Sequence, residues 1–236
     1  MKNICFIGAF DKLDLILYIS KIINNLGKKV LLVDATESQK ARYIVPTINP
    51  TKSYITRFLD IDVAIGFESY KDIERYLGDV DGQGIKYDYA LINADNGNVF
   101  SNFNNADTVK NYFVTSFDVY SIKKGLETIR QIQRPIEITK VLFSREISID
   151  DDYYLDYLSL GYKVIWNDNK IYFPYETQDI EVMIENQKTN KIRIKGLTQQ
   201  YKENLEYMLT EIIPDININN LKKIMKNMER DEWLCL

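Results

Sequence analysis

The sequence contains no histidine. Histidine is the commonest general base and the commonest metal ligand in proteins, so its absence excludes Ser-His-Asp hydrolases and ordinary zinc sites. Only two cysteines are present, Cys5 and Cys235, and two cysteines in 236 residues do not form a disulfide framework. We therefore expect the protein to work in a reducing cytoplasm.

Long apolar runs and an excess of positive charge are also missing. No stretch approaches the roughly 18 apolar residues of a membrane span, and the N-terminus carries acidic residues where a signal peptide would stay apolar. The 30 Lys and Arg residues against 34 Asp and Glu give a net charge of −4, which argues against a nucleic-acid partner. What the chain does have is 45% apolar residues, enough for one sizeable core.

The N-terminal segment has the pattern of a parallel α/β domain. An apolar strand over Lys2–Ile7 leads through a short turn to an amphipathic helix over Leu13–Leu26. Gly27 ends that helix, and a second apolar strand, Val30–Asp34, follows. Strand, turn, helix and strand in this order predict neighbouring parallel strands.

Strands and helices continue to alternate along the chain, without an internal repeat or a low-complexity linker. The pattern predicts further strands over 61–66, 89–93, 111–115, 138–143, 164–166 and 170–173, and helices over 69–77, 119–131, 152–160 and 197–213. The fold class that we expect is therefore three-layer α/β, with a mostly parallel β-sheet flanked by helices. The predicted domain spans 1–213, and an amphipathic tail spans 214–236.

The turn after the first strand is the candidate phosphate-binding loop. A P-loop is rich in glycine and ends in Gly-Lys-Ser/Thr, because bare backbone N–H groups must surround the phosphates. Here the corresponding residues are Gly8, Ala9, Phe10, Asp11, Lys12 and Leu13. The loop has one glycine, and a leucine stands where the Mg²⁺-binding hydroxyl belongs.

Several runs together resemble the ParA/MinD family of deviant Walker P-loop ATPases. The run 27–34 resembles the strand after the P-loop helix, 87–93 resembles the Walker B strand, and 173–175 resembles the late Ile-Pro-Tyr segment. Ala106-Asp107, followed by a strand and then Ser121 and a helix, is similar to the family's next βα unit. The closest subgroup in character is that of atypical TadZ-like members. The resemblance implies a P-loop NTPase-like fold of the SIMIBI type.

Four departures from the family pattern point to a degenerate nucleotide site. Alignment from Gly27 places Lys12 at the phosphate lysine, Asp11 at the last glycine of the motif and Leu13 at the Mg²⁺ threonine. Asn93 occupies the Walker B aspartate position, and an amide does not act as a charged partner of Mg²⁺. The family's adenine-reading asparagine falls near Ser144-Arg145. The resemblance therefore implies a pseudo-ATPase.

Each candidate residue also has a structural interpretation. Lys12 can be a surface residue at a helix start, and Asp11 can cap that helix through its carboxylate. Asp34 either lies near nucleotide and Mg²⁺, as the resemblance implies, or starts a loop. Asp95 follows Asn93 by two residues, and we expect its offset to direct it away from the site. Tyr43, Tyr54, Phe58 and Phe67 lie in the region of the family's switch loops and form either a fixed interface or ordinary packing.

The tail carries an apolar stripe at helical spacing. Its apolar residues are Leu221, Ile224, Met225, Met228, Trp233 and Leu234, with lysines around them. MinD-like proteins place an amphipathic helix at this position on membranes, which implies peripheral membrane contact. Acidic residues near the end of the tail weaken attraction to anionic lipid, so docking on the protein's own domain or on a partner is the other interpretation.

Three functions follow, and we favour the first. The first is a non-catalytic ParA/MinD-like localisation or assembly factor for a pilus, secretion or other cell-envelope machine, which acts through protein partners and a homodimer and needs no cofactor. The second is a divergent ATPase that holds ATP and Mg²⁺ with Lys12 and Asp34, for localisation or for plasmid or chromosome partition. The third, DNA segregation by direct DNA binding, conflicts with the acidic charge balance.

Overall fold

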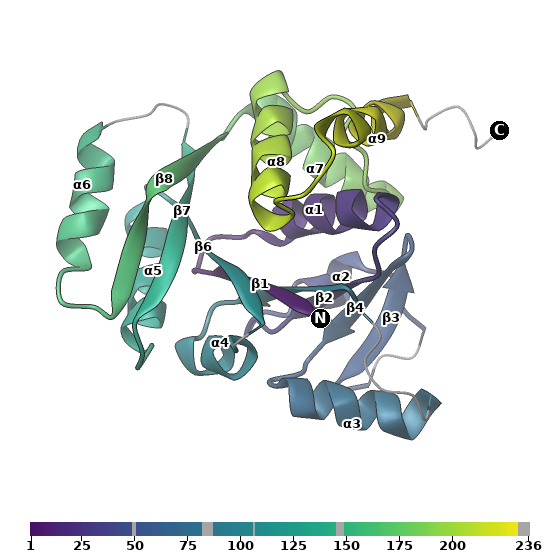
Figure 1. Cartoon of the computed structure of the whole chain (residues 1–236), viewed down its shortest axis with the longest axis horizontal. Coiled ribbons are helices and arrows are strands. Elements are labelled where there is room, and N and C mark those ends of the chain that lie inside the picture. Colours follow the sequence, from purple (N-terminus) through teal and green to yellow (C-terminus); the bar gives the residue numbers. More distant parts are fainter. Residues whose placement is uncertain (49–50, 82–86, 106, 145–148, 231–236) are drawn as a thin grey trace.

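An eight-stranded β-sheet forms the middle layer of the computed structural model (Figure 1). The structure describes residues 1–48, 51–81, 87–105, 107–144 and 149–230. The strands are β1 (Lys2–Ile7), β2 (Val30–Asp34), β3 (Tyr54–Phe58), β4 (Ile61–Ile65), β5 (Tyr89–Ala94), β6 (Thr108–Ser116), β7 (Ile136–Ser144) and β8 (Val164–Pro174). Their order is β3-β4-β2-β5-β1-β6-β7-β8. Every neighbouring pair is parallel except β3 and β4, which confirms the predicted mostly parallel sheet.

Helices cover both faces of this sheet. On one face lie α1 (Leu13–Asn25), α2 (Ala41–Ile44), α7 (Thr177–Thr189), α8 (Gln199–Ile212) and α9 (Ile218–Arg230). On the other lie α3 (Tyr70–Asp81), α4 (Gly97–Phe103), α5 (Val119–Arg130) and α6 (Ile149–Leu158). The central strands β1, β2 and β5 read as continuous apolar runs because helices bury both of their faces.

Five elements differ from the sequence prediction. The antiparallel strand β3 and the helices α2, α4 and α7 were not predicted, and β8 is one strand where two were expected. The polar residues 167–169 interrupt the apolar pattern of β8, and its pairing register with β7 shifts between Ile138 and Lys140. The polar residues 167–169 lie at this register shift, where the regular pairing is interrupted, so the strand continues on both sides of them.

The predicted switch region packs into the fold. Tyr54, Phe58 and Phe67 are all buried, the first two on β3 against the helical face that carries α1. Only Tyr43, on α2, is largely exposed. Of the two interpretations, ordinary packing therefore describes three of these four aromatic residues.

The tail helix α9 docks on the protein's own domain. Leu221, Met225 and Met228 are buried in the same apolar cluster as α1 and α8, and Ile224 packs against that cluster. These side chains, predicted as a partner or membrane contact, are covered by the domain, because their stripe matches its apolar surface. Trp233 and Leu234 lie outside the described residues. Among the described helices, none combines the length and the apolar content that crossing a membrane requires.

Replacing Met228 with alanine tests this docking. Met228 is 6% exposed on the third turn of α9, and we expect its truncation to lower the unfolding free energy by about 2 kcal/mol, since a buried methionine loses contacts and leaves a cavity. Urea denaturation followed by circular dichroism measures the change. The exposed Asn227→Ala is the matched control and should leave stability within experimental error. Equal stability of both variants would mean that α9 is not held on the domain.

Candidate functional site

A pocket of about 330 Å³ opens at the carboxyl ends of the central strands. In open parallel α/β sheets this edge is where ligands bind. Its walls come from the loop after β1, the loop and short helix after β2, and the end of β5. The lining residues are Gly8, Ala9, Phe10, Asp11, Lys12, Thr36, Ser38, Lys40, Tyr43, Asn93 and Asp95.

The loop from Gly8 to Lys12 has one position that requires glycine. Gly8 has a φ of +136°, and a Cβ there would lie 2.3 Å from the carbonyl oxygen of Val114 on β6. The loop therefore passes too close to the neighbouring strand for any side chain. Phe10 instead carries a large ring, whose centroid lies 4.9 Å from that of Phe143 and 6.1 Å from that of Tyr175. Aromatic contacts thus hold the loop against the ends of β7 and β8.

Lys12 is buried beneath this loop. Its side chain is 3% exposed, and Nζ donates a hydrogen bond of 2.7 Å to the carbonyl of Gly8. Burial lowers the pKa of Lys12 from 10.5 to about 8, although the charges of Asp95, Asp11 and Asp34 act in the opposite direction. Within the described residues no carboxylate lies at ion-pair distance from this ammonium group. The surface interpretation of Lys12 is therefore wrong.

Asp11 serves the start of α1. Its Oδ1 accepts a hydrogen bond of 3.2 Å from the backbone N–H of Leu13, and its other oxygen pairs with Lys40. The N-cap position itself is held by Lys12, so Asp11 bonds the helix start from one residue earlier than the capping interpretation placed it. Lys40 also lies 3.9 Å from Asp14 in the first turn of the helix. Leu13 itself is fully buried in the core. No hydroxyl therefore stands at the Mg²⁺ threonine position.

The carboxylate of Asp34 is committed to the local backbone. Oδ1 accepts from the hydroxyl of Thr36 at 2.7 Å and from its N–H at 3.3 Å, while Oδ2 accepts from the N–H of Ala41 at 2.8 Å. Ala41 is the first residue of α2, so Asp34 satisfies an N–H group at the start of that helix. Asp34 is fully buried, and the loop-starting interpretation describes its contacts.

Asn93 and Asp95 come from the end of β5 and both reach the pocket. The amide nitrogen of Asn93 lies 3.4 Å from Oδ1 of Asp34, whereas its buried Oδ1 has no hydrogen-bond partner among the described residues. Both oxygens of Asp95 accept from the N–H of Glu37, at 3.0 and 3.2 Å. Burial raises the pKa of Asp95. The expectation that Asp95 points away from the site is wrong, because Asp95 follows the last β5 residue and strand alternation no longer sets its direction.

Thr36, Ser38, Lys40 and Tyr43 also line the pocket and were not predicted as site residues. These residues follow β2. Ligands in open α/β sheets bind at the carboxyl ends of strands, near the point where the strand order reverses, so the position of these residues directly after a predicted strand could have identified them. Ser144, near the predicted adenine position, ends β7, while Arg145 lies outside the described residues. Among the described residues, no group of three His, Cys, Asp or Glu could hold a metal ion.

Comparisons with known proteins agree with this architecture. No family model matches the sequence, and no curated protein matches it. Solved structures do match the fold. A Borrelia burgdorferi protein assigned to plasmid partition, solved with AMPPNP bound, has a TM-score of 0.55 at 13% identity and covers 92% of this chain and 100% of its own.

Two further solved structures give the same result. The MinC:MinD cell division complex of Aquifex aeolicus matches with a TM-score of 0.55 at 15% identity, over 92% of this chain and 99% of that chain. A ParA family ATPase of Chlorobium tepidum matches with a TM-score of 0.53 at 12% identity, over 88% and 97%. The chain therefore has the fold of the ParA and MinD ATPases, as the sequence resemblance implied.

Proposed function

We propose that this chain is a degenerate, TadZ-like member of the ParA/MinD group that does not hydrolyse ATP. In this proposal it is a localisation or assembly factor of a pilus, secretion or other cell-envelope machine. It works in the cytoplasm or at the inner face of the membrane, through protein partners. The MinD structure that is similar to it was solved as a complex with MinC, which supports a role based on protein contacts.

The contacts of Asp34 carry this proposal. Its carboxylate accepts hydrogen bonds from Thr36 and Ala41 and builds the turn before α2. A carboxylate that is fully buried and bound in this way is not free to orient water or a hydrated Mg²⁺ ion. Asn93 supplies no charge beside it, and Leu13 supplies no hydroxyl. These residues do not fit a magnesium triphosphate.

A binding role without hydrolysis stays compatible with the same pocket. Lys12 is a buried cation without a carboxylate partner, and Asn93 Oδ1 is a buried acceptor without a donor among the described residues. Both observations favour a second candidate function, that of a divergent ATP-binding protein in which Lys12 holds the phosphates. Any such binding has to accommodate Phe10 and the negative charge of Asp11.

Calorimetric titration with ATP and ADP in the presence of Mg²⁺ separates the two candidates. We expect no heat of binding at millimolar nucleotide, either for the wild type or for Lys12→Met. Lys28→Met is the control, because Lys28 is an exposed lysine outside the pocket. Micromolar binding that is lost in Lys12→Met and kept in Lys28→Met would contradict the proposal and favour the second candidate.

A homodimer is part of the proposal. Since nucleotide would not drive pairing, its interface would be constitutive and would lie at the pocket edge, where Tyr43 is 83% exposed. A single species of 27.7 kDa by light scattering at micromolar concentration would contradict this part of the proposal.

A further inference from the structure

The outer face of α6 exposes a row of aromatic and apolar side chains. Tyr153, Tyr157 and Leu160 follow one another at helical spacing on α6 and the turn after it, and they are 67%, 69% and 72% exposed. Tyr154, at 48%, lies beside them. We call these four residues the α6 face. Contiguous exposed groups of this kind mark interaction sites, and tyrosine is enriched in interfaces.

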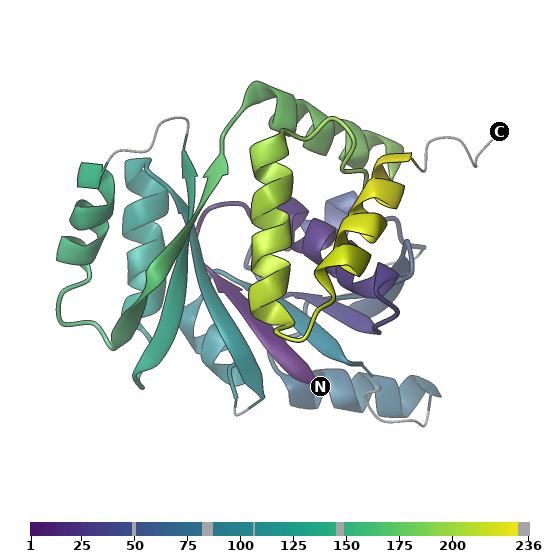
Figure 2. The same cartoon turned by 45° about the horizontal axis from the view of Figure 1, so that its top comes forward.

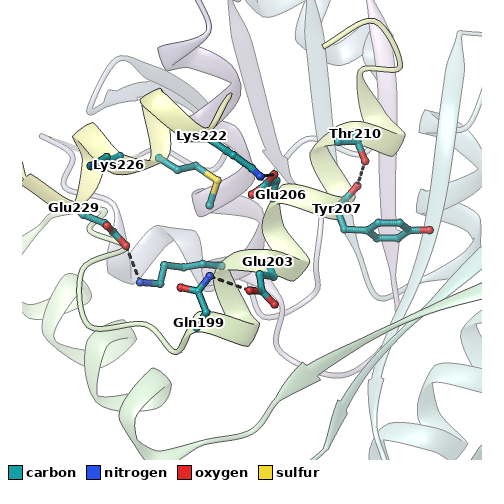
Figure 3. Close-up of a pocket in the computed structure, with 10 residues that line it drawn as sticks. Gln199, Glu203, Glu206, Tyr207, Thr210, Lys222, Lys226 and Glu229 are labelled. Carbon is teal, nitrogen blue, oxygen red and sulfur yellow. Dashed lines mark hydrogen bonds and ion pairs between the residues drawn. The ribbon is translucent and has the colours of Figure 1, made fainter. Parts of the chain in front are cut away.

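The outer face of α9 exposes a row of cations. Lys223, Lys226 and Arg230 stand at positions i, i+3 and i+7 of the helix, and all three are exposed. Within the described chain, no carboxylate pairs with any of them. By contrast, Lys222 lies 3.5 Å from Glu206 and Lys202 lies 2.6 Å from Glu229, in the groove between α8 and α9 (Figure 3). Lys226 lines the edge of the same groove but has no such partner among the described residues. We call Lys223, Lys226 and Arg230 the α9 face.

The two faces lie toward opposite ends of the longest axis of the molecule. In Figure 1 α6 is at the far left and α9 at the upper right, and the turned view of Figure 2 keeps this separation. Each face covers about two helical turns, roughly 10 Å. The two surfaces therefore match in length, and the molecule's own geometry keeps them apart.

We propose that the α6 face of one copy docks on the α9 face of the next, so that copies of this chain associate head to tail. Lysine and arginine side chains pack over tyrosine rings through cation–π contacts. A second copy is the occupant because each copy carries both complementary surfaces.

Head-to-tail contact is heterologous, so it propagates unless the rotation between copies closes a ring. This assembly uses surfaces away from the pocket and does not depend on whether the pocket binds nucleotide. It is also distinct from a homodimer at the pocket edge, because α6 and α9 contribute none of the residues that line the pocket.

Sedimentation velocity on three proteins, the wild type, Tyr153→Ser/Tyr157→Ser and Lys223→Glu/Lys226→Glu, tests the proposal. We expect the wild type to form species that grow with concentration beyond two copies and that shrink as salt is added. Each double variant should grow less, since it keeps only one of the two faces. An equimolar mixture of the two variants should restore a complex larger than either variant forms alone. All the substituted side chains are exposed, and unchanged thermal unfolding of each variant verifies that it folds. If a double variant does not fold, Leu160→Ser or Lys226→Ala replaces it as a milder change of the same face.

Tyr43→Ser and Lys71→Glu are the controls, because both residues are exposed and lie outside the two faces. A wild type that stays at 27.7 kDa at every concentration would overturn the proposal. So would association that Tyr43→Ser weakens while both double variants leave it intact. A wild type that stays monomeric alone, but binds phosphatidylserine vesicles through Lys223 and Lys226, would assign the α9 face to a membrane and also overturn the proposal.

Discussion

Replacing Lys12 with methionine is expected to raise the unfolding free energy at pH 7 by about 2 kcal/mol. The charged lysine is buried and has no carboxylate partner among the residues that the structure describes, and lowering its pKa from 10.5 to about 8 corresponds to a penalty of about 3 kcal/mol. Methionine has a similar length and removes the charge. It also removes the hydrogen bond to the carbonyl of Gly8, which offsets about 1 kcal/mol of the gain.

The pH dependence gives the sharper test of Lys12. Between pH 8 and 10.5 the unfolded chain binds more protons at this lysine than the folded chain does, so the unfolding free energy of the wild type rises with pH through that interval. The rise is absent from Lys12→Met, and the advantage of the variant therefore disappears near pH 10.5. Urea denaturation at several pH values measures both curves, with Lys28→Met as the exposed control. A variant that is less stable than the wild type at pH 7 would show that Lys12 stabilises the fold.

The expected stabilisation by Lys12→Met would bear on function as well as on stability. Proteins retain buried, unpaired charges where binding or catalysis requires them, because elsewhere the desolvation cost is avoided. A charged lysine at position 12 lowers the stability of the fold, so stability does not explain why this residue is a lysine. A buried lysine beneath a loop with one glycine therefore favours a role in ligand binding over a structural role.

The sequence predicted the central part of the fold well. The strands β1, β2 and β5 and the helix α1 were predicted to within one residue, because continuous apolar runs and an amphipathic helix are unambiguous patterns. The strand β3 was not predicted, since it is an antiparallel edge strand whose middle residues are only partly buried. The helix α7 was missed because its apolar side chains form no clear stripe.

The candidate site was predicted in outline but not in its details. Spacing from Gly27 placed Lys12 in the candidate site, the resemblance of 87–93 to the Walker B strand placed Asn93 there, and both line the pocket. Thr36 and Lys40 were missed and the direction of Asp95 was predicted wrongly, because loops after strands follow no periodic pattern and their direction is set by hydrogen bonds such as that from Glu37 to Asp95. The sequence also could not distinguish burial of the tail stripe against its own domain from docking on a partner. An apolar stripe indicates that one face of the helix is buried, but not which surface buries it.

Substitution of Asp34 should change the unfolding free energy in the opposite direction from substitution of Lys12. Replacing Asp34 with alanine is expected to lower the unfolding free energy by about 4 kcal/mol, because the buried hydroxyl of Thr36 and the N–H of Ala41 both lose their acceptor. Thermal or urea unfolding measures the loss, and the exposed Asp215→Ala is the matched control. Asparagine at position 34 keeps one oxygen and should lose less.

The results for Asp34→Ala and Lys12→Met together distinguish a structural role from a ligand-binding role for each residue. If Asp34→Ala is neutral or stabilising, the carboxylate is held in place for a ligand, as we argue for Lys12, and the divergent ATP-binding candidate gains support. If Asp34→Ala is strongly destabilising while Lys12→Met is stabilising, the acidic residue has become part of the scaffold and the lysine has not. The pocket would then hold no free carboxylate at position 34 to direct water onto a phosphate, which is the outcome that the proposal of a pseudo-ATPase expects.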